Sequence, residues 1–195
     1  MGMFNIAIRL APQIAKKVDM SDKKNLLDLG GGPGTYAIHF CINNPDLKAT
    51  IYDLPTTKPH AIKTIEKFGL SSRISFVPGN YINDKVPGNY DVAWLSHILH
   101  SEGKEECEKI IAKVVDSLTN GGKIFIHDFI LNEDRTSPLF PTLFSLNMLV
   151  NTNNGQSYSE SEIIGMLKKA GVKKIKRLKF KSSMESGIIS GVVEK

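Results

Sequence analysis

Short apolar runs alternate along the chain with longer segments in which apolar residues recur every three or four positions. The short runs are typical of buried strands, and the longer periodic segments are typical of amphipathic helices. The pattern predicts helices over residues 3–18, 36–42, 57–68, 102–118, 137–151 and 159–170. It predicts strands over residues 25–29, 48–52, 74–77, 90–96, 123–130, 172–181 and 187–194.

Five of these strands alternate with helices, and the last two follow one another directly. Alternation of strands and helices favours a parallel sheet that is covered on both faces. The sequence therefore predicts an α/β fold, a Rossmann-like, doubly wound, mostly parallel seven-stranded sheet with a C-terminal antiparallel hairpin. We expect a single domain over residues 1–195, with a helix in residues 1–20 packed on it or capping it.

A glycine-rich turn follows the first predicted strand. It contains Gly30, Gly31, Gly32 and Gly34, and Asp28 stands two residues before the first glycine. Glycines allow sharp turns and let a ligand approach the backbone, and a strand, a glycine turn and a helix start together hold nucleotide-like cofactors. The early acid and the Gly-x-Gly-x-Gly spacing favour S-adenosylmethionine (SAM) over a dinucleotide.

Polar residues also follow the later strands, at the carboxyl ends where open α/β sheets bind ligands. Asp53 ends the second strand, 21 residues after Gly32. That distance suits an acid that accepts hydrogen bonds from the ribose of an adenosine. Further candidates at strand ends are Asn80, Tyr81, Ser96, His100 and Asp128. For residues 53–55 the alternative is a plain turn, and one such residue can arise by chance, but five successive strand ends share the pattern.

Several segments then occur in an order that resembles a known family. They include Leu-Asp-Leu-Gly-Gly-Gly-Pro-Gly at 27–34, Asp-Leu-Pro at 53–55 and Leu-His at 99–100. Others are Pro45 and residues 73–74, 79–81, 105–107, 120–123, 147–149 and 170–171. Over about residues 4–194 the chain resembles the catalytic domain of SAM-dependent O-methyltransferases of the caffeate and hydroxyindole type.

The resemblance implies roles for the residues of the cofactor site. The implied cofactor-binding residues are Asp28, Gly30, Gly31, Gly32, Gly34, Asp53, Leu54, Asn80, Tyr81 and Ser96. The glycine turn would hold the methionine part of SAM, Asp53 the ribose, and Leu54 and Tyr81 the adenine. Asn80 stands where the family has an Asp near the adenine amine, and Ser96 stands where plant members carry a Lys.

Methyl transfer to a hydroxyl needs alignment of the reactants and a group that accepts the proton. A phenol has a pKa of about 10, so a base helps at neutral pH. The resemblance implies that His100 is this base and that Asp128 orients it. Ser101 and Ser157 stand where the family carries acids, which puts that orientation in question. For His100, the alternative is a residue at the start of a helix with no catalytic role.

Two further histidines and the two cysteines carry weaker signals. His97 and His127 are secondary candidates for the base, with local packing or hydrogen bonding as the alternative. Cys41 and Cys107 lie in helical patterns without the spacing of metal ligands or disulfides. We expect both thiols to be packed in a reducing compartment, and we expect no metal site.

Family members usually carry a helical N-terminal domain of about a hundred residues, whereas one predicted helix precedes the glycine turn here. The sequence leaves open a truncated product, a lid from another polypeptide, or an open pocket for a bulky acceptor. A homodimer or a helical partner protein is therefore among the expected partners. The apolar segment 139–144 either lines the acceptor pocket or packs in the core.

Composition changes this picture little. The net charge is +5, and there is no apolar run of membrane-spanning length and no signal peptide, so we expect a cytoplasmic location without membrane contact. The basic run over residues 168–181 fits a solvated face better than a nucleic-acid surface, because no aromatic residues interleave with it. Residues 96–99 also lack the Pro-Pro-Tyr/Phe pattern of enzymes that methylate base amines.

The sequence therefore predicts a SAM-dependent O-methyltransferase that acts on a hydroxyl of a small aromatic or polyketide-like molecule. The first alternative is a cofactor-binding subunit or fragment that needs a helical partner for activity. The second, less favoured, is an RNA methyltransferase recruited through the basic run.

Overall fold

The computed structural model describes residues 2–180, 182 and 184–195, with side chains from residue 7 onward. The chain divides into two compact units, Met1–Trp94 and Leu95–Lys195. Met1, at the start of the expected N-terminal helix, and Lys181, at the end of an expected strand, lie outside the described residues. The single domain over residues 1–195 stays a prediction.

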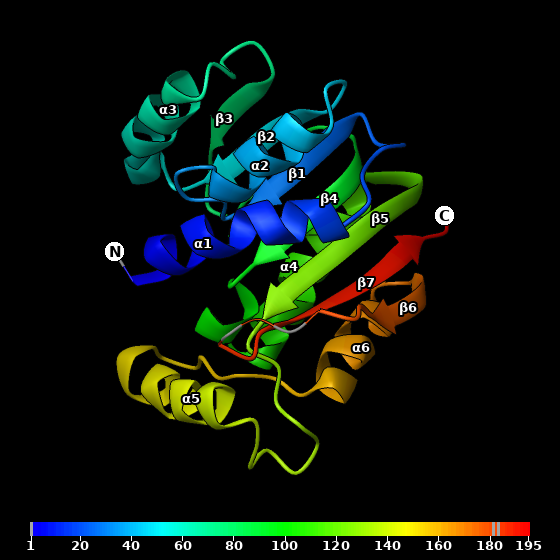
Figure 1. Cartoon of the computed structure of the whole chain (residues 1–195). Helices are drawn as coiled ribbons and strands as arrows, with labels where there is room; N and C mark the ends of the chain where they lie inside the picture. Colours follow the sequence, from blue (N-terminus) through cyan, green and yellow to red (C-terminus); the bar gives the residue numbers. More distant parts are fainter. Residues whose placement is uncertain (1, 181, 183) are drawn as a thin grey trace. The chain divides into compact units, whose positions relative to one another are not determined.

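The first unit is built from parallel strands and the helices between them (Figure 1). Its elements are α1 (Gly2–Lys17), β1 (Asn25–Leu29), α2 (Thr35–Asn43), β2 (Lys48–Asp53), η1 (Pro55–Thr57), α3 (Lys58–Lys67), β3 (Ile74–Pro78) and most of β4 (Tyr90–Ser96). The strands lie in the order β3-β2-β1-β4. Helix α1 packs against α2 and contains Pro12.

Burial explains why β1 forms at the centre of this unit. Its residues Leu26, Leu27 and Leu29 are fully buried, as expected for a strand covered on both faces. Parallel pairing sets Leu29 opposite Tyr52 of β2. The carboxyl ends of the two strands therefore lie side by side, and the glycine turn and Asp53 emerge at one edge.

The second unit contains the end of β4 and an antiparallel arrangement (Figure 1). Its elements are η2 (Leu99–Ser101), α4 (Lys104–Ser117), β5 (Leu118–Asp128), α5 (Leu139–Asn151), α6 (Glu160–Lys169), β6 (Val172–Arg177) and β7 (Gly187–Val193). Strand β7 lies between β5 and β6 and is antiparallel to both. Ser159 and Glu162 form a capping box at the start of α6, as Ser and Glu at this spacing favour.

The predicted fold class is confirmed: a mixed α/β arrangement of seven strands, parallel at first, with an antiparallel pair at the C-terminal end. The bounds of β5 were wrong, because the strand starts at Leu118 instead of residue 123. Residues 120–122, expected to form a loop, belong to it. Asn120 Oδ1 accepts the backbone N–H of Lys195 (2.8 Å), which ties this stretch to the chain end.

Strands β5 and β6 also end earlier than predicted, each for a local reason. The carboxylate of Asp128 accepts the N–H of Phe129 (2.8 Å), and β5 ends there instead of at residue 130. Lys174 has a φ of 50°, and the register between β6 and β7 shifts around it. Strand β6 therefore ends at Arg177, short of the predicted residue 181.

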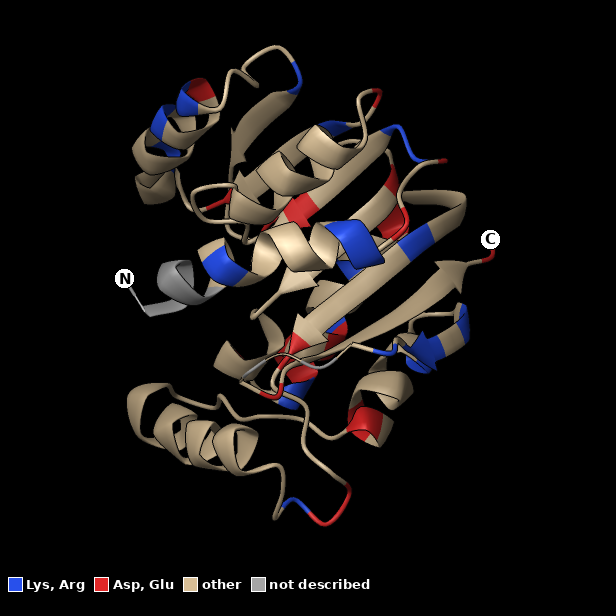
Figure 2. Cartoon of the chain, viewed as in Figure 1, with Lys and Arg blue, Asp and Glu red and all other residues tan. Residues whose placement is uncertain are grey.

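The basic run forms ion pairs with nearby acids. Lys169 pairs with Glu108 (2.6 Å), and Arg177 pairs with Glu160 (2.9 Å). Figure 2 shows Lys and Arg along β6, with acidic residues at the start of α6. This supports the solvated face over a nucleic-acid surface. Among the described residues, no helix is both long and apolar enough to cross a membrane.

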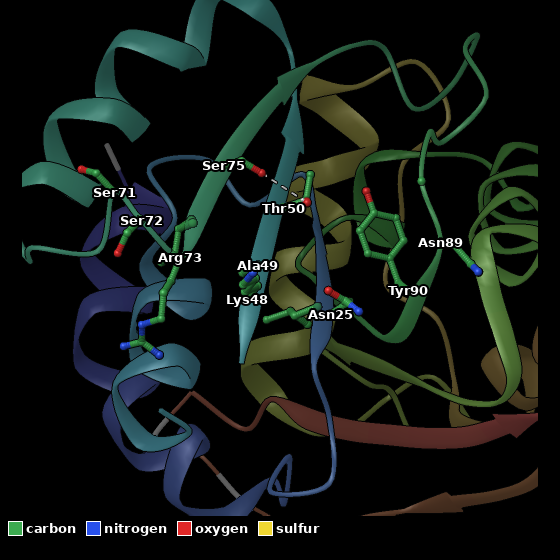
Figure 3. A pocket seen from close by; sticks show the side chains of 13 residues that line it. Asn25, Lys48, Ala49, Thr50, Ser71, Ser72, Arg73, Ser75, Asn89 and Tyr90 are labelled. Carbon is green, nitrogen blue, oxygen red and sulfur yellow. Dashed lines mark hydrogen bonds between the residues drawn. The ribbon is translucent and has the colours of Figure 1, made fainter. Parts of the chain in front are cut away.

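A cavity of about 370 Å³ opens at the amino ends of the parallel strands (Figure 3). Asn25, Thr50, Ser75 and Tyr90 line it, and the hydroxyls of Thr50 and Ser75 lie 3.3 Å apart. Arg73 also lines the cavity, and it donates to backbone carbonyls around the end of α2, which stabilises that turn. The cavity is at the edge opposite the glycine turn, and the predicted site residues do not line it.

Candidate active site

The glycine turn after β1 has the backbone geometry that its sequence predicts. Gly32 has a φ of 55°, in the left-handed region that side chains disfavour. Its N–H donates to Asp53 Oδ2 (2.7 Å). The two residues predicted to share the cofactor, 21 positions apart, are thus in direct contact.

Asp53 is nearly buried and organises the end of β2. Besides Gly32, its carboxylate accepts the N–H of Leu54 (2.6 Å) and faces the hydroxyl of Thr57 (3.4 Å). A carboxylate has about four acceptor positions, so further donors can still bind. Leu54 is 43% exposed beside it, so an apolar side chain is available for a planar ligand.

Asp28 is buried beneath the glycine turn. Its Oδ2 accepts the N–H of Ala37 (3.2 Å), and its Oδ1 has no hydrogen-bond partner among the described residues. Burial raises the pKa of Asp28 to about 7, with a smaller contribution from the charge of Asp53. A Cβ on Gly31 would lie 2.6 Å from this carboxyl group, so only glycine allows the turn to cover it.

The segment after β3 folds onto the same edge. Gly79 packs so closely on Tyr52 that a Cβ there would overlap the phenol ring, and its N–H donates to the carbonyl of Asp53 (2.9 Å). Asn80 Oδ1 accepts the N–H of Ile82 (2.9 Å), so this amide oxygen is used within its own loop. Tyr81 is partly exposed next to it. Their contact with adenine stays a prediction.

The predicted base and its orienting acid meet in the second unit. His100 lies in η2 and Asp128 at the end of β5, and His100 Nδ1 is 2.7 Å from Asp128 Oδ1. The backbone N–H of His100 also approaches Asp128 Oδ2 (3.3 Å). Both side chains are 5% exposed. With Nδ1 held by a carboxylate, Nε2 is the ring nitrogen left for an incoming proton.

Burial alone would raise the pKa of Asp128, but its histidine neighbours outweigh burial. The charge and hydrogen bond of His100 and the contact with His97 hold the pKa of Asp128 well below its usual range. The carboxylate is therefore ionised at neutral pH. An ionised partner on Nδ1 stabilises the imidazolium that forms when Nε2 accepts a proton.

Ser96 and His127 form a separate hydrogen-bonded chain. Ser96 Oγ lies 2.8 Å from His127 Nδ1, and Ser186 Oγ lies 2.9 Å from His127 Nε2. Burial holds the pKa of His127 well below its usual range, so the ring is neutral. Local hydrogen bonding, the alternative given for His127, is therefore what the structure shows. Ser96, a predicted cofactor residue, binds this ring.

His97 differs from the other two histidines. It has a φ of 59°, although it is not glycine, and its side chain is 6% exposed. Within the described part of the chain, neither ring nitrogen has a hydrogen-bond partner of normal geometry, and Asp128 Oδ1 lies 3.5 Å from Nδ1. Burial lowers the pKa of His97. Of the two alternatives given for His97, the structure shows local packing, since its ring lies 4.6 Å from the rings of His127 and Phe129, centroid to centroid.

Phenylalanine rings pack beside His100. The ring of Phe144 in α5 lies edge-on to His100, with ring centroids 4.8 Å apart. The centroid of Phe129 lies 4.9 Å from that of Phe140 and 4.6 Å from that of Phe144. Segment 139–144 therefore has two kinds of residue. Its phenylalanines pack beside His100 and Phe129, whereas the side chain of Leu139 is 71% exposed. Its role as an acceptor pocket stays a prediction.

The two serines at the family's acidic positions do not orient His100. Ser157 is buried and donates to the carbonyl of Pro141 (3.2 Å), so it holds α5. The backbone N–H of Ser101 donates to the carbonyl of Ile98 within η2 (3.1 Å). Asp128 is thus the carboxylate that contacts the imidazole.

Two features of this cluster had little signal in the sequence. His97 is a lone histidine before a helix, and such a residue carries no spacing pattern in the sequence. Gly155 was not singled out, yet a Cβ there would lie 2.5 Å from the carbonyl oxygen of His100. A glycine outside a turn motif predicts a close backbone approach only when its neighbour in space is known.

Comparisons with known proteins agree on one family. The O-methyltransferase domain family matches residues 2–173. The chain is 32% identical over 191 residues to the 3-hydroxy-5-methyl-1-naphthoate 3-O-methyltransferase of Streptomyces sahachiroi, covering 98% of this chain and 55% of that protein. The chain spans about half the length of the curated relatives it matches.

Solved structures show the same fold. A crystal structure of an O-methyltransferase from Nostoc punctiforme superposes with a TM-score of 0.91 at 26% identity, covering 97% of this chain and 57% of that one. Human N-acetylserotonin methyltransferase in complex with SAM superposes with a TM-score of 0.82 at 27% identity, covering 95% and 52%. From its sequence and its fold, this chain belongs to the O-methyltransferase domain family.

Proposed function

We propose that this chain catalyses SAM-dependent methyl transfer to a hydroxyl group of a small aromatic or polyketide-like molecule. The observation that carries the proposal is the contact of 2.7 Å between His100 Nδ1 and the buried, ionised Asp128. This pairing leaves Nε2 as a general base for an acceptor hydroxyl. Membership of the O-methyltransferase domain family supports the reaction class.

The first unit fits a SAM molecule in chemistry as well as in pattern. Asp28 Oδ1, a buried acceptor without a partner among the described residues, suits an ammonium donor. Asp53 has acceptor capacity for ribose hydroxyls, and Leu54 offers an apolar face for adenine. When bound, SAM supplies a methyl group on a sulfonium, an electrophile that needs no further activation.

The remaining chemistry belongs to the side chains of the second unit. His100 Nε2 accepts the proton of the acceptor hydroxyl, and Asp128 stabilises the positive charge that the ring gains. Phe129, Phe140 and Phe144 provide aromatic surface against which a planar acceptor can stack. Relatives named for a hydroxynaphthoate and for acetylserotonin support an aromatic acceptor.

The proposal is tested with isotopically labelled SAM and two probe acceptors, 3-hydroxy-1-naphthoate and N-acetylserotonin. We expect label in an alkali-stable methyl ether, and we expect His100→Gln to bind SAM normally while turnover falls. A wild-type protein that binds no SAM at millimolar concentration would disprove the proposed donor. Full turnover of His100→Gln would remove the base.

The exposed face of α5 supports the alternative of a cofactor-binding subunit with a helical partner. Leu139, Leu143, Leu146, Leu149 and Val150 are each more than half exposed, and Figure 2 shows no charged residue on this helix. Apolar surface of this kind favours association. A monomer in gel filtration that methylates small phenols unaided would rule this alternative out.

We propose a cytoplasmic location for the protein.

A further inference from the structure

We propose that His97, His100 and Asp128 form a binding site for a divalent transition-metal ion such as Zn²⁺ or Co²⁺. Each residue offers one ligand atom, and these atoms all lie within 4.8 Å of one another. All three belong to the second unit, His97 and His100 around η2 and Asp128 at the end of β5. The sequence predicted no metal site, because that prediction considered only the spacing of the cysteines.

Two of the three separations between ligand atoms lie near those of a metal site, and all of them are at most 4.8 Å. Asp128 Oδ1 lies 2.7 Å from His100 Nδ1 and 3.5 Å from His97 Nδ1. Ligands at about 2.0–2.1 Å from a tetrahedral zinc are separated by about 3.3 Å. A metal therefore fits if the hydrogen-bonded pair opens by about half an ångström while His97 moves closer.

The state of His97 points independently to a ligand. A buried imidazole whose two nitrogens lack a hydrogen-bond partner in the described chain is unfavourable, because its polar atoms have lost water without a replacement. Its left-handed backbone, with a φ of 59°, adds a further cost. Strained backbone and an unpartnered, buried donor atom occur together where a residue is held for binding. His127 shows the contrast, because serines occupy both of its nitrogens.

The donor set and its surroundings favour transition metals. Two imidazoles and one carboxylate suit Zn²⁺, Co²⁺, Ni²⁺ or Fe²⁺ better than Ca²⁺ or Mg²⁺, which prefer oxygen ligands. Asp128 is held by the backbone N–H groups of Phe129 (2.8 Å) and His100 (3.3 Å), the outer contacts that orient a metal ligand. Three protein ligands leave one position for water.

The site would regulate the proposed methyl transfer, and this consequence rests on the proposed function. A metal on His100 Nδ1 displaces the proton that this nitrogen shares with Asp128, and that single ring proton moves to Nε2. The ring stays neutral, and Nε2 can no longer accept a proton from a hydroxyl. Metal binding and general-base catalysis by His100 therefore exclude one another, and Zn²⁺ acts as an inhibitor.

Titration of the untagged full chain with Co²⁺, followed by visible absorption, tests the site without any methyl transfer. We expect one Co²⁺ per chain, displaced by Zn²⁺. His97→Asn keeps a residue that tolerates left-handed backbone and should weaken the metal affinity at least about 10-fold. The matched control His60→Asn changes an exposed histidine of α3 and should bind as the wild type does.

The outcomes separate the metal site from the proposed function. No cobalt band at millimolar Co²⁺, or equal affinity of wild type and His97→Asn, would overturn the site. If His97→Asn does not fold, judged by circular dichroism, Asp128→Asn replaces it under the same criterion. Metal binding without methyl transfer would refute the proposed function and leave the site standing. If both hold, Zn²⁺ should inhibit the wild type and spare His97→Asn.

Discussion

The two units use carboxylates in different ways. In the first unit, Asp53 accepts backbone N–H groups, among them that of Gly32 at 2.7 Å. In the second, Asp128 faces the side chains of His100 and His97 at 2.7 and 3.5 Å. A carboxylate on backbone amides fixes a loop for binding, whereas a carboxylate on imidazoles controls where protons or metals reside.

This difference also determines how each unit responds to amino-acid substitutions. The first region depends on the absence of Cβ atoms, because Gly31 lies against Asp28 and Gly79 against Tyr52. The second depends on particular ring nitrogens. Substitutions of glycine should therefore affect cofactor affinity, and substitutions of histidine should affect turnover. The following predictions are ordered from the largest expected effect to the smallest.

Replacing His100 tests the proton-transfer role of the second region. We expect His100→Gln to lower kcat by about 10²–10⁴-fold, because general bases contribute on this scale. The measurement is methyl transfer at saturating SAM, with His60→Gln as the control on an exposed histidine. A His100→Gln protein with wild-type kcat would contradict the assignment.

Asp28 makes the stability of the first region depend on pH. Its pKa is about 7 in the folded chain against about 3.8 unfolded, so its stabilising contribution is complete below pH 4 and is lost as pH rises through 7. Asp28→Asn removes this dependence. The free energy of unfolding of wild type should fall by about 2–4 kcal/mol relative to Asp28→Asn between pH 4 and 8.

Urea unfolding of both proteins without SAM, at several pH values, measures that difference. The change with pH is the quantity to compare, since the offset at any single pH includes the altered hydrogen bonding of the amide. Parallel stability profiles for the two proteins would show that Asp28 titrates normally.

Gly31→Ala tests the close approach of the turn to Asp28. A Cβ at 2.6 Å from the carboxyl group must displace the loop, so we expect the affinity for S-adenosylhomocysteine (SAH) to fall by about 1–3 kcal/mol. Gly165→Ala is the matched control, because a Cβ added there meets nothing within 4 Å beyond its chain neighbours and the backbone of its own helix, and the residue is exposed in α6. It should leave affinity unchanged and stabilise the fold by about 0.5–1 kcal/mol.

Equal loss of SAH affinity in Gly31→Ala and Gly165→Ala would indicate a general effect of the substitution. Equal affinity of Gly31→Ala and wild type would show that the turn is not part of the binding surface. Calorimetry measures both variants.

The parts that the sequence predicted well are those set by local pattern. Strands β1 and β4 have the predicted bounds, because each is an apolar run between clear polar or glycine boundaries. The contact between Gly32 and Asp53 followed from parallel strands that end at one edge. The pairing of His100 with Asp128 came from the family resemblance and is seen in the geometry.

The parts that were missed depend on contacts between distant residues. The start of β5 resembles a loop in the sequence, because it contains two glycines. In the structure it is a strand, and Asn120 within it accepts the backbone N–H of Lys195. Ser157 stood at an expected acidic position, yet it binds the carbonyl of Pro141. His97 has no pattern in the sequence. Its strained backbone and its ring nitrogens without a hydrogen-bond partner among the described residues are seen only in the three-dimensional structure.

The most direct test is a calorimetric titration of wild type and His100→Gln with SAH. If the first region binds the methyl donor and the second supplies the base, both proteins bind one SAH per chain with the same affinity, while only the wild type turns over. Absence of SAH binding by folded wild type at millimolar ligand would contradict the account. So would a loss of SAH affinity in His100→Gln as large as that in Gly31→Ala.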